Sequence, residues 1–179
     1  MRLQTQATDE WIIHEEELSV LLAEIVESDL SNIDISETEL PHIDLSNIKL
    51  HNADLSYADL QGAILQGSDL AGAVAVGANL TASKLGRANL VSVNLCGANL
   101  SHASLGGADL SSASLMWANL HDANLYSANL HNANLCWANL TDSNLTDANL
   151  RGVKYNMHTR WPDGLQAQLD KAHFVANYY

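Results

Sequence analysis

A leucine at every fifth residue is the feature that most limits how this chain can fold. The frame is clearest between residues 118 and 140, where an alanine lies two residues before each leucine and an asparagine lies between them. The leucines of this run are Leu120, Leu125, Leu130, Leu135 and Leu140. The same frame extends from Leu30 to Leu150 with two interruptions, Ile35 and Ala75, and Tyr155 closes it.

This five-residue period matches neither the 3.6-residue period of an amphipathic helix nor the two-residue period of a half-buried strand. A short fixed period instead indicates a solenoid, in which each unit buries its apolar face only against neighbouring units. We expect each unit to form one side of a coil, with the small residue and the leucine inside. Leucines of successive coils would then stack roughly 4.8 Å apart, each stabilising the fold by about 1.5–3 kcal/mol. The outward asparagines are expected to stack as amide ladders.

The tandem A(N/D)LXX units resemble the pentapeptide-repeat family, in particular its leucine-centred members, which are abundant in cyanobacteria. The resemblance covers residues 28–155 in over twenty in-frame copies. It implies an all-β solenoid, a right-handed quadrilateral β-helix with four pentapeptides per coil and about six coils in this chain. The departures are Ile33, Ile43 and Ile48 at the small-residue place and the stretch around Ala75. They make the first coils and one side less regular.

We expect three segments: residues 1–27 as an N-terminal helical cap, residues 28–155 as the β-helix, and residues 156–179 as a C-terminal cap or tail. Residues 9–26 have the apolar spacing of an amphipathic helix, with Trp11 and Leu18 on its apolar side. Because a solenoid end exposes an unpaired coil, a covering element is expected there. The alternative is that this helix binds a partner.

The C-terminal segment begins with a turn at Pro162-Asp163-Gly164. Its Thr-Arg-Trp-Pro-Asp-Gly stretch is similar to the tails of other cyanobacterial-type members of the family. Leu165, Leu169, Ala172 and Ala176 then follow helical spacing. We therefore predict a helical tail, with Trp161 and Leu165 covering the last leucines.

Composition narrows the choice of partner and compartment. The net charge of −13 argues against binding to nucleic acid or to an anionic membrane. No apolar run approaches the length of a membrane span, and the N-terminus lacks the basic-then-apolar order of a signal peptide. We therefore expect a cytoplasmic protein.

The two cysteines, Cys96 and Cys136, lie forty residues apart in one column of the predicted rod. Two coils correspond to about 9.6 Å at strand spacing, which exceeds the roughly 7 Å Cα limit for a disulfide. We expect free thiols on the surface; a redox or metal role is the alternative.

Folding the frame by twenties gathers apolar side chains on one side of the rod. Trp117 and Trp137 are one coil apart in one column, with Tyr57 lower down and Gly77 and Gly97 between. The expected protein-contact residues are Val76, Met116, Trp117, Cys136 and Trp137. Clustered apolar surface often marks a contact site. The alternatives are that the returning tail covers the indoles or that they are simply exposed. Because neither indole belongs to the leucine core, changing both to serine is expected to leave stability almost unaltered.

The adjacent side holds His102, His121, Asp122 and Asp142 in neighbouring places. Two imidazoles and two carboxylates are transition-metal ligands. However, strand spacing makes such side chains nearly parallel, and an open wall is expected to lack outer hydrogen-bond partners. We interpret the group as polar residues on a solvated wall and predict no metal site.

The sequence holds no nucleophile–base–orienter set or phosphate loop, and a convex rod offers no concave pocket. We therefore predict neither enzymatic activity nor a cofactor. The leading hypothesis is a structural protein, a scaffold that binds a protein of unknown identity through a flat wall of the β-helix. Self-association as a homodimer, through the C-terminal tail or the tryptophan wall, is also open.

The alternative is a DNA mimic that modulates a type II topoisomerase, gyrase, as some pentapeptide-repeat proteins do. Mimicry needs acids along the rod, because duplex DNA carries a charge about every 1.7 Å. This chain has mostly asparagine at those places. The gyrase-protecting members also favour phenylalanine at the central place, whereas the single phenylalanine here, Phe174, lies in the tail.

Overall fold

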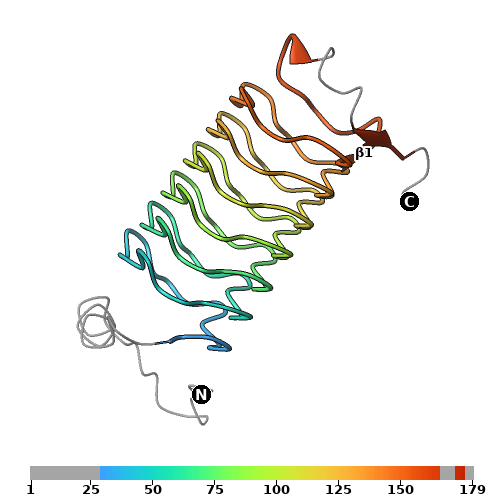
Figure 1. Cartoon of the computed structure of the whole chain (residues 1–179). Helices are drawn as coiled ribbons and strands as arrows, with labels where there is room; N and C mark the ends of the chain where they lie inside the picture. Colours follow the sequence, from blue (N-terminus) through green and yellow to red (C-terminus); the bar gives the residue numbers. More distant parts are fainter. Residues whose placement is uncertain (1–28, 166–171, 176–179) are drawn as a thin grey trace.

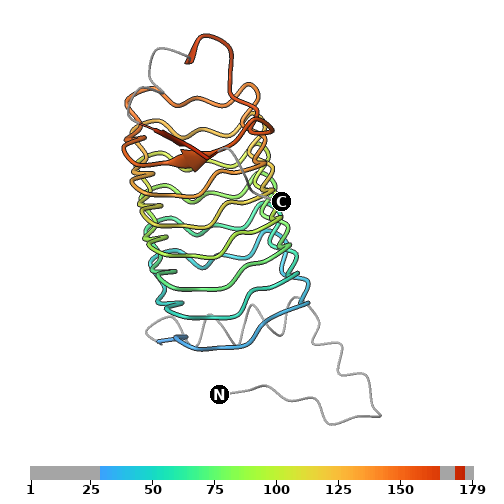
Figure 2. The same ribbon diagram turned by 90° about the vertical axis from the view of Figure 1, so that its right-hand side faces the viewer.

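The computed structural model describes residues 29–165 and 172–175, which form a straight rod of stacked coils (Figure 1). Residues just before the leucine positions pair in parallel with residues twenty further along, from Asp29 with Lys49 to Asn134 with Lys154. With five residues per unit, a twenty-residue step gives each coil four sides. Figure 2 shows the coils one above another in sequence order. The predicted β-solenoid with twenty-residue coils is confirmed.

Every side ends in a tight turn formed by the two residues after the leucine. In the unit of Leu120, the N–H of Ala123 donates across the turn to the Leu120 carbonyl at 3.1 Å. The second turn residue, Asp122, has a φ of 55°, and the same place has positive φ throughout the rod. A positive φ at only the second central residue is the pattern of a type II turn. The turns form the corners and direct their side chains outward.

The asparagine before each leucine completes the backbone hydrogen bonding of its unit. The N–H groups of Asn119, Leu120 and Asp122 donate to carbonyls of neighbouring coils, and that of Ala123 closes the turn. The remaining N–H, that of His121, donates to Oδ1 of Asn119 at 3.2 Å. Since unpaired backbone groups are unfavourable, this bond explains why an amide or carboxylate recurs at this place.

The same asparagines also link successive coils. Nδ2 of Asn119 donates to Oδ1 of Asn99 at 3.1 Å, and Nδ2 of Asn139 donates to Oδ1 of Asn119 at 3.2 Å. Where an aspartate replaces the lower asparagine, its carboxylate accepts in the same way, as Asp109 does from Asn129. The predicted amide ladders are confirmed.

The core is a continuous column of leucines and small residues along the rod axis. Every leucine of the frame from Leu40 to Leu150 is buried, and Ala75 is buried in the central place of its unit. Ile43 and Ile48 are buried at the small-residue place. Ile33, in the first described coil of the rod, is partly buried and packs against the core. The departures from the repeat are therefore accommodated without breaking the coil pairing.

The end of the rod departs from the repeat by one residue. Asn139 pairs with Arg160, a step of twenty-one, directly after Asn134 pairs with Lys154 at a step of twenty. The extra residue brings Asn156 into a buried position. There its Oδ1 accepts the N–H of Trp137 at 3.1 Å.

Two short strands lie at this end: β1, Lys154–Tyr155, and β2, His173–Phe174, which pair in parallel (Figure 1). The N–H of His173 donates to the Val153 carbonyl at 2.6 Å, and the N–H of Val175 donates to the Tyr155 carbonyl at 2.8 Å. The predicted helical tail is therefore wrong for residues 172–175, because unpaired carbonyls of the last coil attract a strand instead.

Leu165 is buried in the core and Trp161 packs partly buried against it, while their covering of the last leucines stays a prediction. The predicted N-terminal helical cap, residues 1–27, and the remainder of the tail lie outside the described residues. Among the residues that the structure describes, no helix has the length and apolar character needed to cross a bilayer.

Candidate functional site

One side of the rod carries the aromatic column, defined here as the outward turn residues Tyr57, Gly77, Gly97, Trp117 and Trp137. Each occupies the second turn place of its unit and has positive φ. Side chains in this column lean toward the next coil: a Cβ added to Gly77 would meet Cε1 of Tyr57 at 2.6 Å. A Cβ added to Gly97 would meet no atom within 4 Å. The column therefore has an open place at Gly97, because Gly77 in the coil before has no side chain to cover it.

Two exposed aromatic rings flank this open place. Tyr57 is 64% exposed and Trp117 is 54% exposed. Of the other predicted contact residues, Met116 and Val76 are half-buried in the neighbouring column. From Val74 to Trp137 the units on this side contain no charged residue. The accessible part of the predicted surface is thus apolar and centred on Trp117.

Trp137 differs from Trp117 although both occupy the same repeat position. Its ring stacks on His158, with centroids 3.6 Å apart and planes 8° apart. His158 follows the one-residue shift, so it continues the column twenty-one residues after Trp137. The alternative of cover by the chain's own C-terminal segment therefore holds for Trp137, which is half-buried, and does not hold for Trp117.

His158 is a member of the column that the repeat frame does not reveal. Its place is hidden because the extra residue after Lys154 shifts the frame, and a strict twenty-residue count ends at Met157. The signal that could have found it is the Asn156–Thr159 pair. Thr159 takes the small-residue place one residue late, directly before Arg160 in the polar place, and both Asn156 and Thr159 are buried.

Both cysteines are free thiols, as predicted, but they are not equivalent. Cys136 is fully buried, and this burial raises the pKa of its thiol. The prediction of a surface position is therefore wrong for Cys136, which contributes nothing to the exposed contact surface. Cys96 is half-buried, and its sulfur atom lies 3.0 Å from Oγ of Ser114.

The aromatic side chains adopt a backbone conformation that bulky residues rarely take. Tyr57 has a φ of 59° and Trp117 a φ of 58°. For a residue with a Cβ, the left-handed region is unfavourable by about 1–2 kcal/mol. The hydrogen bonds between coils hold this conformation, since the N–H of Trp117 donates to the backbone carbonyl of Cys136 at 3.1 Å. Gly77 and Gly97 occupy the same turn place without that strain.

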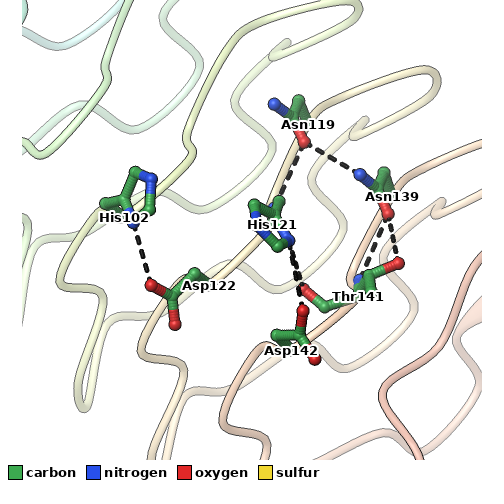
Figure 3. A network of polar contacts seen from close by, with 7 residues as sticks. All are labelled: His102, Asn119, His121, Asp122, Asn139, Thr141 and Asp142. Atoms are coloured by element: carbon green, nitrogen blue, oxygen red, sulfur yellow. Dashed lines mark hydrogen bonds and ion pairs between the residues drawn. The ribbon is translucent and has the colours of Figure 1, made fainter.

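The adjacent side carries the histidine–aspartate network shown in Figure 3. Nδ1 of His102 lies 2.9 Å from Oδ2 of Asp122. Nδ1 of His121 lies 3.0 Å from the Thr141 carbonyl and 3.7 Å from Oδ2 of Asp142. The carboxylates therefore pair with the imidazoles and do not converge with them on a common point. No group of three or more histidine, cysteine or acidic side chains suited to a metal forms within residues 29–165 and 172–175.

The expectation that this network lacks outer hydrogen-bond partners is wrong. Each histidine has one such partner on Nδ1. The reason is the same lean toward the next coil that places Tyr57 over Gly77. It carries a ring nitrogen to an oxygen of the residue one coil above.

A family model described as pentapeptide repeats (8 copies) matches the chain at residues 28–67, 53–90, 78–116, 88–125 and 118–154. These stretches overlap and together span residues 28–154, well over half of the 179 residues. No curated protein sequence matches significantly.

Among solved structures, the chain is similar to Rfr23, a pentapeptide repeat protein from the cyanobacterium Cyanothece 51142. The identity is 26%, over 80% of this chain and 99% of that one, with a TM-score of 0.56. It is also similar in fold to QnrB1, a plasmid-mediated fluoroquinolone resistance protein. In its trypsin-treated form the identity is 19%, over 79% and 80% of the two chains, with a TM-score of 0.55.

Proposed function

The chain belongs to the pentapeptide-repeat family, whose members form right-handed quadrilateral β-helices, and we propose that it is a non-catalytic scaffold. A rod of about six coils binds another protein through the side that carries the aromatic column. Tyr57 and Trp117 are the anchors, and Val76 and Met116 extend the apolar surface between them.

The observation that carries this proposal is the exposure of Trp117 in a strained turn place. An exposed indole is unfavourable in water, and the left-handed conformation adds to that cost. Glycine at Gly77 and Gly97 occupies the same place without strain. Trp117 therefore contributes nothing to the rod that glycine would not. Indoles are favoured contact anchors, because they bury a large area with few rotatable bonds.

The absence of catalysis is part of the proposal. A catalytic set requires a nucleophile and a base within hydrogen-bond reach and a concave place for the substrate. The two paired histidines, His102 and His121, contact only carboxylate and carbonyl oxygens through Nδ1. They are oriented, but neither of these contacts brings a nucleophile to them.

The test compares the proteins captured from a native lysate by the parent and by a Tyr57→Gly/Trp117→Gly variant. Glycine suits both turn places, so the variant keeps the rod and lacks both anchors. The matched control is Tyr126→Gly, because Tyr126 is a 48% exposed aromatic residue on another side of the rod.

We expect one partner that is captured by the parent and by the control and is lost from the double variant. If the double variant captures the same proteins as the parent, the aromatic column is not the contact surface. Light scattering of the same variants during gel filtration tests self-association through this side or through the C-terminal tail.

A DNA-mimic modulator of gyrase is the second candidate, favoured by the net charge of −13. Its weakness is the distribution of that charge, since asparagine occupies most outward places before the leucines from Asn79 onward. The scaffold proposal predicts that micromolar protein neither inhibits nor protects gyrase in a supercoiling assay. Clear inhibition would reverse the order of the two candidates.

A further inference from the structure

His102 and His121 are adjacent although they are nineteen residues apart in the sequence. The N–H of His102 donates to the His121 carbonyl at 3.0 Å, so the coil pairing fixes the spacing of the two residues. Their ring centroids are 5.9 Å apart, with the planes at 71° (Figure 3). Both side chains are accessible, with 55% and 42% of their surfaces exposed.

The hydrogen bonds of the two rings determine where their protons lie. The Thr141 carbonyl only accepts, so Nδ1 of neutral His121 carries the proton and donates it. The ionised carboxylate of Asp122 imposes the same tautomer on His102. In each neutral ring the lone pair is therefore on Nε2, which has no hydrogen-bond partner among the described residues. A histidine that donates Nδ1–H to a carboxylate or carbonyl is the usual form of a metal ligand.

The spacing of the rings suits a shared ion. A metal–nitrogen bond of about 2.1 Å places the ion roughly 3.2 Å from the ring centre. Two rings on one ion then have centroids from about 4.5 Å apart at a right angle to about 6.4 Å apart in line. The observed 5.9 Å falls inside this range.

We propose that His102 and His121 bind one divalent transition-metal ion through their Nε2 atoms and clip two successive coils together. Imidazole pairs select Ni²⁺, Cu²⁺ and Zn²⁺ over Mg²⁺ and Ca²⁺, which prefer oxygen ligands. Water completes the coordination. Asp122 acts as a positioning residue, because its carboxylate fixes the tautomer and orientation of His102.

A third histidine provides a matched control. His131 occupies the same repeat place as His121, and its Nδ1 lies 2.9 Å from the Arg151 carbonyl. Its Nε2, however, accepts from Nδ2 of Asn132 at 3.2 Å. The His131 ring is therefore oriented like a ligand while its second nitrogen is already occupied.

The test is calorimetric titration of the full chain, free of any histidine tag, with NiCl₂. We expect one ion per chain, bound at least tenfold more weakly by His102→Asn and by His121→Asn. The control His131→Asn should bind as the parent does. Asp122→Asn, which keeps a residue suited to positive φ, should weaken binding tenfold to a hundredfold. A melting curve of each variant verifies that it is folded.

A second readout is the melting temperature with and without NiCl₂. The ion should raise it in the parent and in His131→Asn and should leave it unchanged in His121→Asn. The proposal fails if the parent binds no Ni²⁺ at millimolar concentration. It also fails if His102→Asn or His121→Asn binds as the parent does, or if His131→Asn loses the same affinity.

Discussion

At the scale of single residues, each five-residue unit has a buried leucine and, directly before it, a polar residue that is most often asparagine. In the unit of Leu120, the side chain of this asparagine accepts a backbone N–H of its own unit and donates to the asparagine one coil before. Asn119 accepts the His121 N–H and donates to Asn99, while Leu120 beside it is fully buried. Neighbouring residues of one unit therefore differ sharply in what a substitution does.

The first prediction places the same negative charge at these two neighbouring residues. Leu120→Asp should prevent folding, because an unpaired carboxylate in the apolar column is unfavourable by several kcal/mol. Asn119→Asp keeps the acceptor for the His121 N–H and loses only the donor to Asn99, so we expect a loss of about 1 kcal/mol. Thermal melting of both variants checks this. Equal stability would show that the inward and outward assignment is wrong.

The second prediction concerns acid. Hydrogen bonds from the Ser46 side chain and backbone N–H hold the pKa of Asp44 below its usual 3.8. A lowered folded-state pKa means that the stabilisation is present above pH 3.8 and is lost as the pH falls through the folded value. Asp44→Asn keeps an acceptor that does not titrate, so its urea midpoint should fall less than that of the parent below pH 4. Parallel pH profiles would contradict this.

At the scale of structural elements, the end of the rod decides which parts of the aromatic column stay accessible. The step of twenty-one residues from Asn139 to Arg160 carries His158 onto Trp137, and β2 pairs with β1 beside it. One coil below, Trp117 remains exposed. The expectation that changing both tryptophans leaves stability unaltered therefore needs revision, because Trp137 packs against the C-terminal segment.

The third prediction separates the two tryptophans. Trp137→Ser should lower stability by about 1–2 kcal/mol, because it loses the stack on His158 and the cover of that corner. Trp117→Ser should change stability by less than about 0.5 kcal/mol, as expected for an exposed side chain. Urea unfolding measures both, and His158→Ala should reproduce part of the Trp137 loss. A larger loss in Trp117→Ser than in Trp137→Ser would overturn this account of the column.

At the scale of the whole molecule, each coil contacts only the coil before it and the coil after it. The parallel pairing runs without a break from Asp29 to Arg160. In such a rod, stability is approximately a sum over coils and their interfaces. The length of the rod is therefore adjustable in whole coils, whereas the register within a coil is not.

The fourth prediction tests this with two internal deletions. Removing residues 81–100 joins Leu80 to Ser101, which occupies the same place as Thr81 one coil later, so the shortened chain should fold with a lower melting temperature. Removing residues 81–93 deletes less but leaves Leu95 only two residues after Leu80, which is too short to form a side. Circular dichroism and melting should show the smaller deletion to be the more damaging. The reverse order would rule out a twenty-residue coil.

The sequence by itself determined the core, the coil length and the side on which each residue lies. The reason is that all three depend on one short-range rule, since a residue meets its neighbours at a constant offset of twenty. Leucines at a fixed place must then share the axis, and Trp117 must share a column with Tyr57. The five predicted contact residues could be placed on one side for the same reason.

What only the tertiary structure decided lies where that offset fails or where rotamers matter. One extra residue after Lys154 gives Trp137 its cover and leaves Trp117 exposed, and no repeat pattern encodes that step. The return of β2 to the last coil depends on unpaired carbonyls at a chain end, which local spacing does not reveal. The orientation of His102 and His121 likewise follows from the oxygens one coil above them. A repeat determines which residues are neighbours, and the hydrogen bonds between coils determine how their side chains are oriented.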